Sequence, residues 1–73
     1  VNAEFYQALK NQFPALTKSE VELCGYLRVG LSNKDIAALK NIAPASVKMS
    51  KNRLRKKLGL DAEGDLYGFM QRL

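Results

Sequence analysis

Apolar residues recur at spacings of three and four in five successive segments of this chain, which is the pattern of amphipathic helices. The first segment, residues 2–13, is ended by Pro14, because proline cannot continue a helix. Its apolar stripe has three members: Phe5, Leu9 and Phe13. No alternation typical of strands, no repeat and no low-complexity segment occurs in the sequence. The sequence therefore predicts a single all-α domain over residues 1–73, in which residues 1–14 cover a core built by residues 16–73.

The second and third helices are predicted from their N-terminal caps. In a capping box, two residues three apart each accept a hydrogen bond from the other's backbone N–H group. Thr17 with Glu20 fits this motif. Ser32 with Asp35 also fits it, with aspartate in place of the usual glutamate. We expect helices over two ranges: 18–29, ended by Gly30, and 33–40. Their expected inward residues are Leu23, Cys24 and Leu27, then Ile36, Ala37 and Leu39, with Tyr26 at the edge.

The fourth and fifth helices follow a predicted turn at residues 41–43. Pro44 suits the first position of a helix, where its missing N–H group would have no partner, and Gly59 suits the C-cap after Leu58. Asp61 is expected to cap the last helix, which two glycines weaken by roughly 1 kcal/mol each relative to alanine. These are Gly64 and Gly68, and the expected core face is Leu66, Phe69, Met70 and Leu73.

The basic residues concentrate in the fourth helix and the segment before it. Between Asp35 and Asp61 there is no acidic residue, whereas seven of the twelve basic residues of the chain lie there. They are Lys40, Lys48, Lys51, Arg53, Arg55, Lys56 and Lys57. Val47, Leu54 and Leu58 form one stripe of the same helix, so its other face is cationic. Together with a net charge of +5, this indicates a domain that binds a polyanion.

The composition argues against an enzyme. The 73 residues contain one cysteine, Cys24, so no disulfide can form within the chain. They contain no histidine, so the usual general base and the usual metal ligands are missing. The acidic residues are dispersed toward the two ends of the chain, which disfavours a metal-dependent nuclease. We therefore expect no catalysis, no cofactor and no metal, and we interpret Cys24 as a packed apolar side chain. The apolar runs are much shorter than a membrane span, and a first residue that is Val1 rather than methionine indicates a module of a longer protein.

From Leu16 to Leu66 the chain resembles the LuxR-type (GerE-like) helix-turn-helix domain in the order and spacing of its residues. The residues that carry the resemblance are Leu16-Thr17, Glu20, Glu22, the run from Gly30 through Ala37, Ser46-Val47-Lys48, and Lys57-Leu58-Gly59-Leu60. The chain departs from the family pattern at Ser50, where histidine is frequent, and at Ala43, where the N-cap is usually serine. At position 40 the family usually has leucine; this chain has Lys40 there and a leucine one position earlier, Leu39.

This resemblance implies a four-helix helix-turn-helix core, plus the N-terminal helix, that serves as the C-terminal output module of a bacterial transcriptional regulator. Such a module acts in the cytoplasm, has double-stranded DNA as its partner and places its second motif helix, here about 44–58, in the major groove. Because one helix reads few base pairs, we expect a homodimer on DNA or a dimer formed through other domains. The expected dimer contacts are Glu63, Tyr67 and Gln71, for which plain solvent exposure is the alternative interpretation.

The phase of the fourth helix separates two kinds of DNA contact. Opposite its apolar stripe, near the end expected to enter the groove, lie the three expected base-contacting residues: Lys48, Met49 and Asn52. The expected phosphate contacts are Ser32, Asn33, Lys34, Ser46, Lys51, Arg53, Arg55, Lys56 and Lys57. Ser32 also has a purely structural interpretation as a cap. The alternative function is a protein-interaction module whose basic face docks on an acidic partner, such as a subunit of RNA polymerase or the regulator's own sensor domain.

Overall fold

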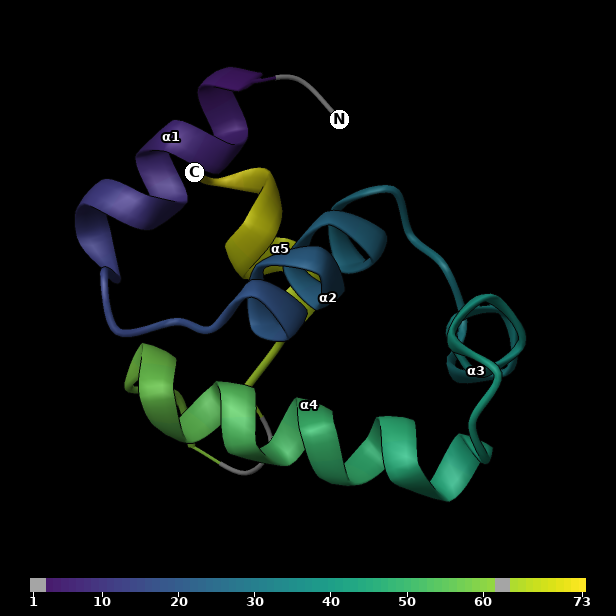
Figure 1. Cartoon of the computed structure of the whole chain (residues 1–73). Helices are drawn as coiled ribbons and strands as arrows, with labels where there is room; N and C mark the ends of the chain where they lie inside the picture. Colours follow the sequence, from purple (N-terminus) through teal and green to yellow (C-terminus); the bar gives the residue numbers. More distant parts are fainter. Residues whose placement is uncertain (1–2, 62–63) are drawn as a thin grey trace.

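The computed structural model describes residues 3–61 and 64–73, and its described residues form five α-helices (Figure 1). They are α1 (Ala3–Gln12), α2 (Lys18–Arg28), α3 (Asn33–Lys40), α4 (Pro44–Leu58) and α5 (Leu66–Gln71). In Figure 1, α2 lies in the middle, with α4 below it, α3 to one side, α5 behind it and α1 above. The prediction of an all-α domain is confirmed. None of the helices in the described ranges is long and apolar enough to cross a membrane.

Both predicted capping boxes are present. At the start of α2, Glu20 N donates to Thr17 Oγ1 at 3.3 Å, and Thr17 N donates to Glu20 Oε1 at 2.8 Å. At the start of α3, Asp35 N donates to Ser32 Oγ at 3.2 Å, and Ser32 N donates to Asp35 Oδ2 at 3.4 Å. The longest of these four distances is the one to Asp35 Oδ2, and the aspartate side chain is one methylene shorter than that of glutamate. Local sequence thus determines where these two helices begin.

The ends of α3 and α4 each use a residue in the left-handed conformation. Gly59 ends α4 with φ 78°, as predicted, and Asn41 ends α3 with φ 56°. Asparagine tolerates this conformation better than most residues with a Cβ atom. At the other end of α4, Ala43 supplies no side-chain hydrogen bond, and Pro44 occupies the first turn. The chain therefore turns tightly between α3 and α4, which places the two helices as a helix-turn-helix pair.

One continuous core joins all five helices. Its buried members are Phe5, Leu9, Leu23, Cys24, Leu27, Ile36, Ala37, Val47, Leu54, Leu58, Leu66 and Met70. Arg28 of α2 ties two further helices together: its guanidinium lies 4.7 Å from the ring centre of Phe5, and its Nη1 donates to Met70 O at 2.7 Å. Four further side chains that were predicted at the core or at its edge are partly buried against it: Phe13, Tyr26, Phe69 and Leu73.

One prediction about the core is wrong. Leu39 was expected to face inward but is 63% exposed. A helix turns by about 100° per residue, so position 40 lies on the same side of α3 as the buried Ile36 and Ala37. Lys40 therefore continues the inward stripe, and Leu39 lies well off it. The displaced leucine therefore does not replace the missing one. Instead, Lys40 is half-buried.

The last helix begins later than predicted. Its N-cap is Asp65, which makes no side-chain capping hydrogen bond, and not Asp61. Gly64 precedes the helix, and its N–H group donates to Asp61 O at 3.0 Å, outside any helix. The low helix propensity of glycine is a physical reason for this short helix of six residues. Its expected core face is nevertheless correct, because Leu66 and Met70 are buried.

Candidate nucleic-acid interface

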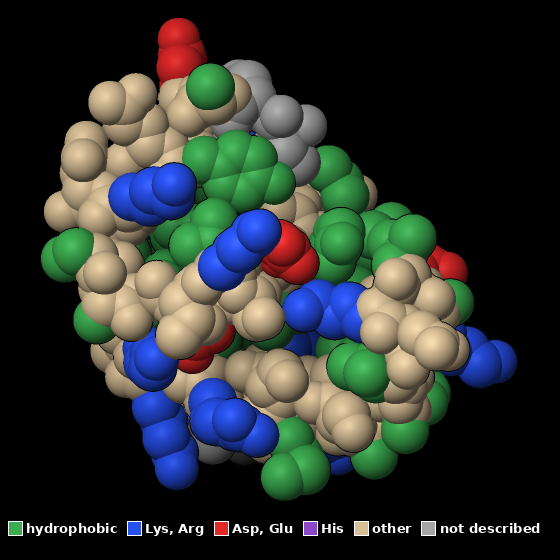
Figure 2. Space-filling model, viewed as in Figure 1, with side chains coloured by type: hydrophobic (Ala, Val, Ile, Leu, Met, Phe, Trp, Pro, Cys, Tyr) green, Lys and Arg blue, Asp and Glu red, His purple; other side chains and the backbone are tan. Residues whose placement is uncertain are grey.

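The interface is built on α4, whose two sides differ as the sequence predicted. Val47, Leu54 and Leu58 are buried against the core. The opposite side of the helix is exposed, and Figure 2 shows Lys and Arg side chains gathered over the C-terminal half of α4, at the lower left of the view. The helix is therefore held by an apolar stripe and presents a cationic surface outward.

The three residues expected to contact bases lie together on this outward side. Lys48 and Asn52 are exposed, and Met49 is 59% exposed. They fall within an arc of about 100° because residues three and four apart on a helix share a face. Met49 is one of the few large apolar side chains left in water in the described parts of the chain. A thymine methyl group is one surface that such a side chain could cover.

Arg55 holds Asn52 in a defined position. Arg55 Nη1 donates to Asn52 Oδ1 at 2.8 Å, and Arg55 Nε donates to Gly64 O at 3.0 Å. The same guanidinium thus orients a side chain of α4 and fixes the segment that precedes α5. The sequence predicts Arg55 only as a phosphate contact. The contact with Gly64 could not be expected from the sequence, because it depends on the path of the chain between α4 and α5.

Lys51 is also bound inside the domain. Its Nζ atom donates to Asn33 Oδ1 at 2.9 Å, which ties the middle of α4 to the first turn of α3. Burial lowers the pKa of Lys51, and the nearby positive charge of Arg55 lowers it further. Lys51 and Asn33 therefore fix the angle between the two helices of the motif, whatever contacts they make with a ligand.

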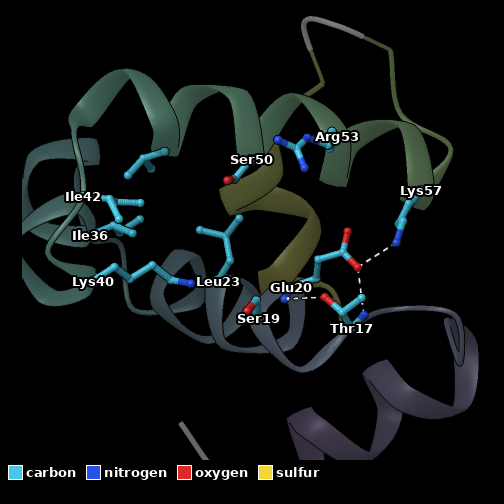
Figure 3. A pocket seen from close by; sticks show the side chains of 11 residues that line it. Thr17, Ser19, Glu20, Leu23, Ile36, Lys40, Ile42, Ser50, Arg53 and Lys57 are labelled. Atoms are coloured by element: carbon cyan, nitrogen blue, oxygen red, sulfur yellow. Dashed lines mark hydrogen bonds and ion pairs between the residues drawn. The ribbon is translucent and has the colours of Figure 1, made fainter.

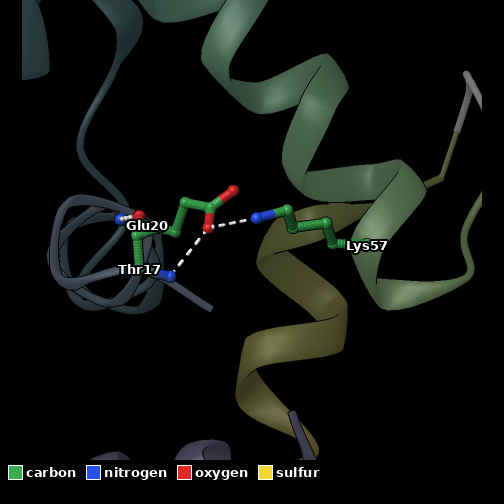
Figure 4. A network of polar contacts seen from close by, with 3 residues as sticks. All are labelled: Thr17, Glu20 and Lys57. Atoms are coloured by element: carbon green, nitrogen blue, oxygen red, sulfur yellow. Dashed lines mark hydrogen bonds and ion pairs between the residues drawn. The ribbon is translucent and has the colours of Figure 1, made fainter. Parts of the chain in front are cut away.

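Lys57 forms an ion pair with the capping box of α2 (Figure 4). Its Nζ atom lies 2.8 Å from Glu20 Oε1, the oxygen that also accepts the N–H group of Thr17. Burial raises the pKa of Glu20, but the hydrogen bonds from Lys57 and Thr17 together outweigh it, so the pKa lies below its ordinary value. The charge of Lys57 is thus largely balanced within the domain.

The remaining expected phosphate contacts lie on the surface. Ser32, Lys34, Ser46, Arg53 and Lys56 are all exposed. Within residues 3–61 and 64–73, the side chains of Lys34, Arg53 and Lys56 form no ion pair. Ser32 is engaged as the cap of α3, which supports its structural interpretation. The structure therefore divides the predicted set into cations that are free at the surface and cations that have protein partners.

Two of the expected dimer residues, Tyr67 and Gln71, belong to α5. Tyr67 is 53% exposed, whereas the Gln71 side chain donates to Arg28 O of α2. Glu63 lies outside the described residues.

Cys24 is fully buried, and burial, followed by the negative charge of Glu20, raises the pKa of its thiol to about 12. Among the described residues, no group of three or more His, Cys, Asp or Glu side chains is placed to hold a metal ion.

A tight turn between two helices, with the second one cationic and exposed, defines the helix-turn-helix class of DNA-binding domains. The sequence model of the family GerE, described as bacterial regulatory proteins of the luxR family, matches residues 14–70, and the chain belongs to this family. It is a family of DNA-binding regulators and not of enzymes. No curated protein and no solved structure matches the chain significantly. Helix α1 precedes the matched segment, although Phe5 and Leu9 are part of the core.

Proposed function

We propose that this domain binds double-stranded DNA with sequence preference, with α4 in the major groove and Lys48, Met49 and Asn52 against the base edges. The observation that carries the proposal is their joint exposure on the side of α4 opposite Val47 and Leu54. Lysine can donate to the acceptor atoms of guanine, asparagine can pair with the N6 donor and the N7 acceptor of adenine, and methionine can cover the methyl group of thymine. Lys48 has no ion pair in the described parts of the chain, so it is the principal base-reading residue of the proposal.

The proposed phosphate contacts act in two ways. Most of the salt-dependent attraction comes from three cations that form no ion pair among the residues the structure describes: Lys34, Arg53 and Lys56. Lys51, Arg55 and Lys57 contribute less, because internal acceptors already hold them. Ser32, Asn33 and Ser46 add polar contacts at the starts of α3 and α4, where helix N-termini favour anions.

Two copies of the domain are needed for useful specificity, because one recognition helix reads only a few base pairs. We propose that they bind half-sites about one DNA turn apart, as the output domain of a regulator in the bacterial cytoplasm. The exposed side of α5, with Tyr67 and Gln71, is the proposed contact between copies, and Glu63 belongs to the same proposal by its place in the sequence. Tyr67 supports this role by its exposure.

Selection of duplexes from a random DNA library tests the proposal. Residues 1–73 would be immobilised as a pair on a dimeric carrier, and bound duplexes sequenced after several rounds at fixed salt. We expect a short motif, repeated at a separation of about one DNA turn. Sequence-blind recovery that weakens only with salt would contradict base reading and would favour docking of the basic face on an acidic protein, such as a subunit of RNA polymerase.

A further inference from the structure

A groove with an apolar floor lies between α2, the C-terminal end of α3 and α4 (Figure 3). Its volume is about 270 Å³. Leu23, Ile36 and Val47 form the floor, one residue from each helix, and Ile42 stands at the rim with 40% of its surface exposed. The three floor residues are themselves buried, with at most 3% of their surface exposed, so Ile42 and the stem of Lys40 provide the apolar surface that a partner can contact.

The groove exists because a lysine occupies an inward position of α3. Lys40 lies one turn after the buried Ile36, where an apolar side chain would fill the space between the helices. A lysine keeps its ammonium group in water while its stem covers apolar surface. Figure 3 shows the Lys40 side chain extended along the groove toward α2. The gap therefore remains open and has a positive charge at its mouth.

The charges around the groove do not cancel. At one end, Lys57 and Glu20 neutralise each other at 2.8 Å. Lys40 and Arg53 also line the groove, and neither forms an ion pair within residues 3–61 and 64–73. Two unmatched cations thus border an apolar floor. An occupant complementary to this surface carries both a carboxylate and a large apolar group.

We propose that the groove binds an acidic segment of a partner protein, with one large apolar side chain against Ile42 and the stem of Lys40, and a carboxylate between Lys40 and Arg53. An enclosed small molecule fits less well, because ligand sites commonly measure about 300 to 1,000 Å³ and this groove is smaller and open. The exposed Ile42 continues the apolar surface beyond the groove, which favours a larger partner. DNA phosphates would satisfy the cations but would leave the apolar side chain of Ile42 uncovered.

This groove and the proposed DNA-reading face are different surfaces. Lys40 and Ile42 precede α4 and belong to neither the base nor the phosphate contacts proposed above. Arg53 and Lys57 border both surfaces, so they are left out of the test. The groove proposal does not rest on DNA binding.

The test is selection of peptides from a random display library against residues 1–73. We expect the recovered peptides to pair Asp or Glu with Leu, Ile or Phe. Ile42→Ser and Lys40→Glu should each weaken their binding by roughly tenfold, as for contacts at the centre of an interface. The matched controls are Leu39→Ser, which changes a more exposed side chain of α3, and Lys10→Glu, which makes the same charge change on α1.

Recovery of no peptide would overturn the proposal, as would peptides without this pattern. Equal binding to Ile42→Ser and Leu39→Ser would also overturn it. Circular dichroism of each variant separates loss of binding from loss of fold. DNA binding is measured separately, and Ile42→Ser should select the same DNA motif as the unsubstituted chain. A chain that binds the peptides but selects no DNA motif would refute the DNA function and leave the groove proposal intact.

Discussion

Lys57 Nζ at the C-terminal end of α4 lies 2.8 Å from Glu20 Oε1 in the first turn of α2. This ion pair joins residues 37 positions apart and lies beside the cationic surface of α4. The carboxylate that stabilises the start of α2 therefore also reduces the positive charge that α4 offers to a polyanion. The ion pair couples the stability of α2 to the electrostatics of the proposed DNA interface.

Glu20→Gln is expected to strengthen binding to every duplex. The amide oxygen of glutamine can still accept the N–H group of Thr17, but Lys57 loses its partner charge and becomes available to phosphate. Titrations at several salt concentrations should show a steeper slope of log affinity against log salt, by roughly 0.9 for one added contact. Glu4→Gln on α1 makes the same charge change as a control. An equal slope for the two variants would show that Lys57 gains no contact with DNA.

The stability of the domain should depend on pH through Glu20. Because the pKa of Glu20 is lowered by folding, its carboxylate stabilises the fold above the ordinary pKa of glutamate, about 4.3, and this stabilisation is lost as the pH falls through the lowered value. Since Lys57 is well exposed, the effect should stay below about 1 kcal/mol. Chemical denaturation of the unsubstituted chain and Glu20→Gln should differ at pH 7 and converge at acid pH. A constant difference across that range would assign the effect to another group.

Leu54→Ala should destabilise the domain severely. Leu54 is fully buried on the central stripe of α4, and truncation of such a leucine commonly costs about 2 to 5 kcal/mol. A domain of this size has little reserve of stability. Thermal unfolding followed by circular dichroism should show a much lower midpoint, whereas the exposed Leu39→Ala should change it little. Similar midpoints for the two variants would mean that α4 is rotated from the orientation described.

Lys56→Ala should weaken binding to all DNA sequences alike. Lys56 is exposed and, in the described parts of the chain, unpaired, so its charge is available to a phosphate. The slope of log affinity against log salt should flatten by roughly 0.9. Lys10→Ala on α1, outside the matched family segment, is the control with the same loss of charge. If sequence preference changed while the slope stayed constant, Lys56 would belong with the base-reading residues.

Features set by neighbouring residues could be predicted from the sequence. The two capping boxes, Pro44 at the start of α4 and Gly59 at its end depend on contacts within a few residues, and all were confirmed. Leu39 does not replace the leucine that the family has at position 40, because a shift of one position rotates a helical side chain by about 100°. The stripe through Ile36 points instead to Lys40.

Contacts between distant segments could not be predicted. Lys51 with Asn33 and Arg55 with Gly64 depend on how α4 packs against α3 and on the chain before α5. From composition, every cation of α4 looked equally available. The structure separates the cations held by internal acceptors from those that are free, a distinction on which the proposed roles now depend. The assignment of base and phosphate contacts stays a prediction.

Competition binding of Lys48→Ala tests the central claim most directly. The unsubstituted chain and the variant, both as dimeric fusions, would be titrated against the selected site and against sites changed at one base pair each. We predict that Lys48→Ala loses about 1 to 3 kcal/mol of preference at one or two base pairs, while binding to unrelated duplexes changes much less. An equal loss on every site, with circular dichroism unchanged, would contradict base reading by the exposed face of α4.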